Sequence, residues 1–135
     1  MASILKVDEL QGIVSAGDIT VTSEGGAATQ SLQQGLAKAW QNLNGSTFGL
    51  RDSFNTSTAT DVSTGNYNFS FTNNMSNDDY TIVMSTQNFS TNTNTANNIH
   101  QGLAPTTSTV RVQHVENSAV ADTSEVACTT NGDLA

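Results

Sequence analysis

Two short stretches decide the fold: Asn66–Thr72, which reads NYNFSFT, and Tyr80–Gln87, which reads YTIVMSTQ. Apolar side chains alternate with Asn, Ser and Thr in the first stretch and with Thr81, Val83 and Ser85 in the second, which is the pattern of a strand whose side chains point to opposite faces in turn. Turn-forming residues lie at 63–65 and around Met75, and the stretch Arg51–Ser57, RDSFNTS, precedes them. The pattern predicts three antiparallel strands in a meander. The three aromatics of the first stretch share one face, which we expect to be buried: Tyr67, Phe69 and Phe71.

The composition is unusually polar but not that of a disordered chain. Hydrophobic residues make up 36%, aromatic residues 6% and charged residues 12%, while Thr, Ser and Asn number 20, 15 and 15. Disordered segments lack a repeated apolar face, so the alternation described above argues against disorder. A surface made soluble by neutral polar groups suits a β-rich extracellular or virion protein better than a cytosolic enzyme.

The charge balance excludes two classes of partner. The formal net charge is -8, and the four cations are Lys6, Lys38, Arg51 and Arg111. Nucleic-acid binding requires a basic patch that releases counterions from the phosphates, and four scattered cations cannot form one. An acidic chain is also repelled by anionic membrane surfaces. We therefore expect neither a nucleic acid nor a membrane as a partner.

The single cysteine and the first residues of the chain bear on the cellular compartment of the protein. Cys128 is the only cysteine, so an intrachain disulfide is excluded and a buried small residue is the simplest interpretation. No stretch has the length and apolar character of a membrane span. The first residues, Met1–Asp8, lack a signal-peptide pattern. We expect synthesis in a cytosol and, if the protein leaves the cell, release by lysis.

Further strands are predicted on both sides of the meander. Ile19–Thr22 has high β propensity, and Asn44–Gly45 is a strong hairpin signal. Residues 107–115 alternate clearly, and residues 119–128 form a weaker final strand before a polar tail. Residues 27–39 suggest a short helix or an irregular linker, because Gly35 lowers helix propensity. Seven or eight short strands predict an all-β fold, a small antiparallel β-sandwich or flattened barrel with an extended N-terminal arm.

The arm is predicted to anchor the protein. We place it at residues 1–26 and the β-sandwich domain at residues 27–135. Its spacing fits either a helix or a strand, and it holds too much apolar surface to remain in water without a partner. A sister subunit, the domain itself or a larger host structure would each cover it. The candidate assembly and anchoring residues are Ile4, Leu5, Val7, Leu10, Ile13 and Val14.

A second candidate surface is the low-complexity segment 88–102, which we expect to be a loop. Long loops in compact domains are either functional or mobile, and the Asn- and Thr-rich composition fits both descriptions. The candidate surface-contact residues in it are Asn88, Phe89, Asn92, Asn94, Asn97 and Asn98.

No catalytic or metal-binding motif stands out. The two histidines, His100 and His114, have no partners at metal-ligand spacing, and we expect structural roles for them. Asp78–Asp79 lies among asparagines but lacks the twelve-residue calcium loop, so a turn is the better interpretation. Core packing is the simplest interpretation of Trp40. Nucleophile elbows, phosphate loops and paired carboxylates are missing, so we expect no enzyme activity, no metal and no cofactor.

Several segments resemble the tail-fibre and related appendage proteins of marine tailed bacteriophages. The similarity covers roughly residues 1–87 and names a structural module with no active site to carry over. The segments that carry it are the opening Met1–Gly12, then Gly25–Ala27, Leu32–Trp40, Asn42–Gly45, Arg51–Asn55, Gly65–Tyr67 and Phe71.

The resemblance implies a structural component of a virion, such as a tail fibre or other appendage subunit, that attaches through its N-terminal arm. It also implies a homo-oligomer, most simply a homotrimer, with other virion proteins as partners. Because the chain is short, a head fibre or a capsid decoration protein is an alternative. A second alternative is a receptor-recognition module for host attachment that binds host-surface glycan.

Overall fold

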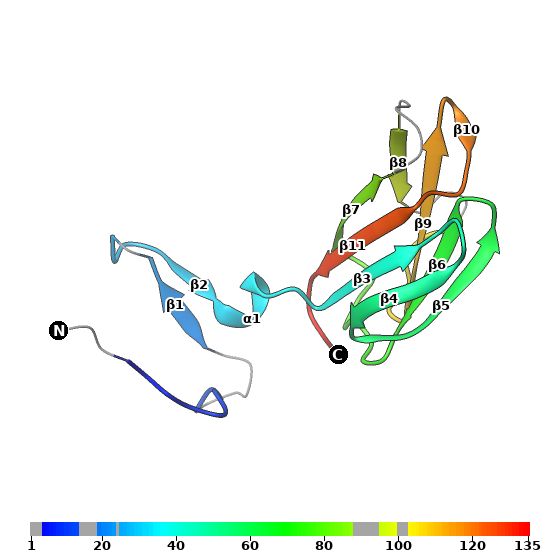
Figure 1. Cartoon of the computed structure of the whole chain (residues 1–135). Helices are drawn as coiled ribbons and strands as arrows, with labels where there is room; N and C mark the ends of the chain where they lie inside the picture. The colour runs from blue at the N-terminus through cyan, green and yellow to red at the C-terminus, as the bar shows by residue number, and fades with distance from the viewer. Residues whose placement is uncertain (1–3, 14–18, 24, 88–94, 100–102) are drawn as a thin grey trace. The chain divides into compact units, whose positions relative to one another are not determined.

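The described chain consists of two compact units, and each is treated by itself (Figure 1). Residues 1–36 form the N-terminal unit and residues 37–135 form the sandwich unit. The sequence places the division between residues 26 and 27, whereas the structure joins residues 27–36 to the N-terminal unit. The computed structural model describes residues 4–13, 19–23, 25–87, 95–99 and 103–135, with only the backbone for 95–99.

The N-terminal unit contains one hairpin and one helical turn. Strand β1 (Thr20–Thr22) pairs antiparallel with β2 (Thr29–Ser31). Helix α1 (Leu32–Gly35) follows directly, and Ser31 Oγ caps it by accepting from the backbone N–H of Gln34 at 3.4 Å. No described residue of this unit is buried. The unit therefore lacks a core of its own, and an isolated two-stranded hairpin is only marginally stable in water.

The sandwich unit consists of two antiparallel sheets, which confirms the predicted β-sandwich (Figure 1). One sheet has the strand order β4–β3–β11–β7, and the other has the order β10–β9–β6–β5 with β8 also paired to β9. The strands are β3 (Ala39–Asn44), β4 (Gly49–Phe54), β5 (Thr56–Ser63), β6 (Asn66–Phe71), β7 (Thr81–Gln87), β8 (Thr95–Ile99), β9 (Thr109–Glu116), β10 (Ala119–Val120) and β11 (Glu125–Asn131).

The core lies between the sheets and follows the predicted alternation. Tyr67, Phe69 and Phe71 of β6 are 0%, 0% and 5% exposed, so this expectation is confirmed. Their neighbours Asn68 and Ser70 point to the other face of the sheet. The remaining buried core residues come from inward positions of three further strands, β3, β9 and β11, and from the connection between β6 and β7: Ala39, Leu43, Met75, Tyr80, Val110, Val112, Val126 and Cys128.

The predicted meander is correct for its first hairpin only. Strands β5 and β6 pair across a turn in which Gly65 takes a φ of 65°, but β6 and β7 belong to different sheets. Residues 72–80 carry the chain across the core, because Met75 within them is buried and bridges Leu134. At the end of this crossing, Tyr80 packs its ring against Phe71 with the centroids 5.7 Å apart. Local alternation predicts each strand but not which strand becomes its neighbour.

Two expectations near the C-terminus are also wrong. The predicted final strand at 119–128 is divided into β10 and β11, and β11 continues to Asn131 through the segment expected to be a polar tail. It is an interior strand paired with both β3 and β7. Residues 95–99, expected to lie in a loop, form β8. Pairing partners distant in the sequence stabilise both segments despite their polar composition.

The predicted hairpin at Asn44–Gly45 joins β3 to β4 and also locks one end of the core. Gly45 N–H donates to the carbonyl of Thr123 at 3.0 Å. A side chain at Gly45 would collide with the Tyr67 hydroxyl and with that carbonyl. Only glycine therefore allows this turn to lie so close to β6 and to the segment that leads into β11.

Candidate functional site

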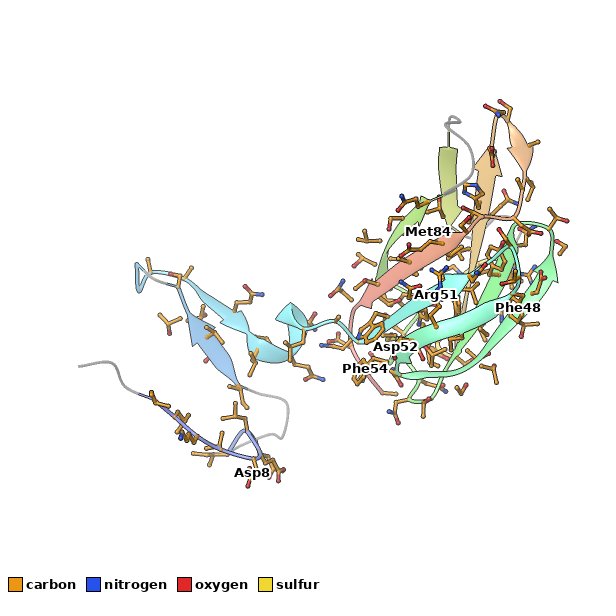
Figure 2. All side chains as sticks on the ribbon, in the orientation of Figure 1. Asp8, Phe48, Arg51, Asp52, Phe54 and Met84 are labelled. Carbon is orange, nitrogen blue, oxygen red and sulfur yellow. The ribbon has the colours of Figure 1, made fainter. Side chains whose placement is uncertain are left out.

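The predicted anchoring residues that the structure describes are exposed within the N-terminal unit. Ile4, Leu5, Val7, Leu10 and Ile13 are each between 51% and 104% exposed. They lie in a segment outside the named helices and strands, whose one labelled side chain in Figure 2 is Asp8. Val14 lies outside the described residues. A run of large apolar side chains this exposed is typical of a surface that binds another molecule.

The predicted surface loop is only partly described. Asn88, Phe89, Asn92 and Asn94 lie outside the described residues. Asn97 and Asn98 are on β8, where their backbones pair with His114 and Gln113 of β9.

An apolar row crosses the outer face of the four-stranded sheet. Phe54 on β4 pairs with Trp40 on β3, Trp40 pairs with Thr129 on β11, and Thr129 pairs with Val83 on β7. Phe54, Trp40 and Val83 are 51%, 36% and 66% exposed. More buried side chains alternate with these positions along β3, β7 and β11. We call Phe54, Trp40, Thr129 and Val83 the apolar row.

A polar network borders the apolar row on the same face. Arg51 Nη1 donates to Asn42 Oδ1 at 3.2 Å, and its Nη2 donates to the Ser124 carbonyl at 2.8 Å. Asn42 in turn donates to Glu125 Oε1 at 3.0 Å, and Glu125 lies 3.9 Å from Arg51. Figure 2 shows Arg51, Asp52 and Phe54 along β4. An apolar centre with Arg and polar groups at its edge is the usual anatomy of a protein interface.

The centre of the outer face of the five-stranded sheet is polar instead, and the exposed Val62 and Val120 lie on its edge strands β5 and β10. Thr60 of β5, Asn68 of β6 and Arg111 of β9 form one row across it. Thr58, Ser70 and Thr109 form the next row. We call these two rows the polar face. A sandwich whose two outer faces both meet water is expected to be polar on both, so the apolar row distinguishes one face of this molecule.

The interpretation of Trp40 as a core residue is wrong. Ala39, Gln41 and Leu43 point inward on β3, and Trp40 therefore points outward with Asn42. The sequence contains this signal, because Trp40 shares its strand parity with Asn42 and Asn44. Large aromatics are so often buried that core packing is the simpler expectation for a single Trp, whereas the alternation along the strand indicates an outward side chain.

One end of the sandwich holds a cluster of buried polar groups. His114 is fully buried, and its Nδ1 lies 2.9 Å from Thr86 Oγ1. Burial lowers the pKa of His114, while Glu116 and Asp122 oppose that shift. The Tyr67 hydroxyl donates to Asp122 Oδ1 at 3.1 Å, and the same oxygen accepts from the backbone N–H of Gly65. Burial and the Asp122 charge raise the pKa of Tyr67.

These contacts give the buried groups structural roles. Asp122 ties the β5–β6 turn and the Tyr67 ring to the segment before β11, and His114 joins β9 to β7 through Thr86. Burial raises the pKa of Cys128 to about 12, so its thiol stays protonated and unreactive. Among the described residues, no three His, Cys, Asp or Glu side chains gather as a metal site requires. No helix in the described part of the chain has the length and apolarity to cross a bilayer.

Comparison of the chain with protein-family models, with curated proteins and with solved structures gives no match in any of the three.

Proposed function

We propose that this protein is a non-enzymatic structural component of a bacteriophage virion. It assembles as a homo-oligomer, and its N-terminal arm attaches it to other virion proteins. A tail fibre or other appendage subunit is the leading assignment, and a capsid decoration protein is the alternative position. The bacteriophage assignment rests on the sequence resemblance, which also implies a trimer.

The observation that carries the attachment role is the exposed apolar arm. Its large side chains, from Ile4 to Ile13, are at least half exposed, and no described residue of the N-terminal unit is buried. Covering one such side chain contributes roughly 1.5–3 kcal/mol. Ordering the backbone costs about 1–2 kcal/mol per residue, so a partner has to cover several of these side chains together. The sandwich unit, in contrast, buries its own core.

The position of the protein is tested by mass spectrometry on purified virus particles. We expect the chain in particles at a fixed copy number, and its confinement to the unassembled fraction of the lysate would contradict the proposal. The arm is then tested with Leu5→Ser, Val7→Ser and Leu10→Ser combined. This variant should fold but stay out of particles, whereas the matched polar variant Glu9→Gln with Gln11→Ser should be incorporated. Normal incorporation of the first variant would place the attachment elsewhere.

A host-surface glycan-binding module is the second candidate, favoured by the exposed pair Trp40 and Phe54. Flat aromatic side chains exposed next to hydrogen-bonding groups can hold the apolar face of a sugar ring. A glycan array with the purified protein tests this function. Binding that Trp40→Ala abolishes would support it, and an array without any bound sugar would count against it.

A further inference from the structure

We propose that the apolar row is a self-association surface, on which a second copy of this chain packs the same face about a two-fold axis parallel to the strands. The inference depends on the sandwich surface alone and holds whether or not the protein belongs to a virion. It assigns an occupant to the apolar row, for which the proposed function names none.

The first argument is the contrast between the two outer faces. The polar face carries Thr60, Asn68 and Arg111 in the row that crosses its centre. The apolar row carries Phe54, Trp40 and Val83, all more than a third exposed. Both faces belong to one sandwich with one core. Stability of the core therefore does not account for the difference, whereas contact with another molecule does.

The second argument is the order of side-chain sizes along the row. From β4 to β7 the order is Phe54, Trp40, Thr129 and Val83, with the two aromatics on one half and two small β-branched residues on the other. A two-fold axis parallel to the strands, placed between β3 and β11, reverses the order in the partner. Phe54 then lies opposite Val83 of the second copy, and Trp40 lies opposite Thr129. Large side chains meet small ones, as close packing between sheets requires.

In the neighbouring row, too, the two-fold axis places larger side chains opposite smaller ones. Asp52 on β4 pairs with Asn42 on β3, Asn42 with Ala127 on β11, and Ala127 with Ser85 on β7. Under the same axis, Asp52 of one copy lies opposite Ser85 of the other, and Asn42 lies opposite Ala127. No two like charges face each other in these rows, although both copies are acidic. The face is therefore complementary to itself in size and in charge, which an isologous contact requires.

The dimensions indicate a reversible contact. Four strands about 4.8 Å apart and roughly 20 Å long make a face of about 400 Å² in projection. Stable specific interfaces bury about 800 Å² of accessible surface on each partner. The projected face is about half of that value, so the contact is small, although its Trp and Arg residues are of the kinds that dominate interface energetics. We expect a dimer that dissociates on dilution unless the copies are also held together elsewhere.

The contact is tested on the full chain by analytical ultracentrifugation with a matched pair of variants. Val83→Glu places a charge in the apolar row, and Thr60→Glu places the same charge on the polar face. Val83→Glu should halve the mass of the assembly or weaken its dissociation constant at least tenfold, and Thr60→Glu should leave both unchanged. Equal masses for wild type, Val83→Glu and Thr60→Glu over the same concentration range would overturn the inference.

The register is tested by cross-linking two variants that each add one cysteine to the chain, Phe54→Cys and Val83→Cys, with a bismaleimide that reaches about 10 Å, the spacing of packed sheets. The mixture should give cross-linked dimers, while each variant alone should give few. Wild type controls for Cys128, which is buried. Equal cross-linking by Phe54→Cys alone would overturn the proposed axis. Loss of glycan or cell binding in Val83→Glu without a change in mass would instead assign the row to a host ligand and overturn self-association.

Discussion

The N-terminal unit and the sandwich unit differ in how their apolar side chains are covered. In the sandwich, Tyr67, Phe69 and Val112 are fully buried between two sheets. In the N-terminal unit, large apolar side chains such as Leu5 and Ile13 remain exposed, and no described residue is buried. Both units contain strands and turns. Regular backbone structure alone therefore does not make a stable domain, since most of the stability comes from the packed apolar core.

The largest expected effect of a substitution separates the two units directly. Phe69→Ala removes a fully buried ring from the sandwich core and should lower the free energy of unfolding by about 3–5 kcal/mol. Leu10→Ala removes an exposed side chain and should change it by less than about 0.5 kcal/mol in the unassembled chain. Urea denaturation measures both. A loss below about 1 kcal/mol for Phe69→Ala would contradict the described core.

Two glycines with positive φ provide a second comparison. Gly65 in the sandwich has a φ of 65°, and an added side chain there would meet the Ala121 backbone. Gly26 in the N-terminal unit has a φ of 70°, but the space around it is open. Left-handed backbone strain costs about 1–2 kcal/mol in either place. We expect Gly65→Ala to destabilise the sandwich by about 2 kcal/mol or more and Gly26→Ala to leave its melting temperature unchanged.

The acid limb of the stability curve should report on His114 in the sandwich. Its pKa is lowered in the folded state, chiefly by burial, so the unfolded chain takes up its proton at a higher pH. The contribution of neutral His114 is present above about pH 6.5 and is lost as the pH falls toward the folded-state pKa. Thermal melts from pH 7 to 5 should show this loss. His114→Gln should have a flatter acid limb, and an unchanged limb would contradict the assignment.

The alkaline limb should report on Cys128 and Tyr80. Burial raises the pKa of each to about 12 in the folded state. The stabilisation by the protonated groups is complete below their usual pKa values of 9.0 and 10.0 and is lost as the pH rises toward 12. Melts above pH 9 test this, and Cys128→Ala should retain more of its own neutral-pH stability at pH 10 than wild type does.

The smallest expected effect comes from removing most of the exposed unit. Deletion of residues 1–24 should leave the β-rich circular dichroism and the melting temperature of the sandwich nearly unchanged, because the core lies wholly in residues 37–135. Particle incorporation of the same protein should fail. Collapse of the sandwich would contradict the division into two units, and normal incorporation would contradict attachment through the arm.

The sequence was sufficient for strands whose alternation is local. The buried face of β6, the hairpin at Asn44–Gly45 and the burial of Cys128 all follow from period-two patterning and turn residues. The assignment of β7 to the second sheet was not predictable in this way, because it depends on pairing with β11, whose residues lie 38 to 50 positions further along the chain. Strand β8 was missed for a similar reason: its polar residues gain order from β9.

The two candidate surfaces also differ in how far the local sequence predicts them. The exposed arm is predictable from the sequence. Its apolar residues do not continue in a strand or helix pattern long enough to form a core, so another surface has to bury them. The apolar row is not, because Phe54, Trp40 and Val83 come together only through the registers of three strand pairs. Local sequence indicates the face on which Trp40 lies but not its neighbours across the sheet.

The central claim is that the N-terminal unit depends on a partner for its order, and residue-resolved hydrogen exchange tests it most directly. In dilute, unassembled protein, amides of β3, β6, β9 and β11 should be protected to nearly the full free energy of unfolding, while amides of residues 4–36 should exchange at rates close to those of an unfolded chain. Protection of residues 4–36 should appear only in the assembled protein. Protection of these residues in the dilute chain at the level of β6 would contradict the account.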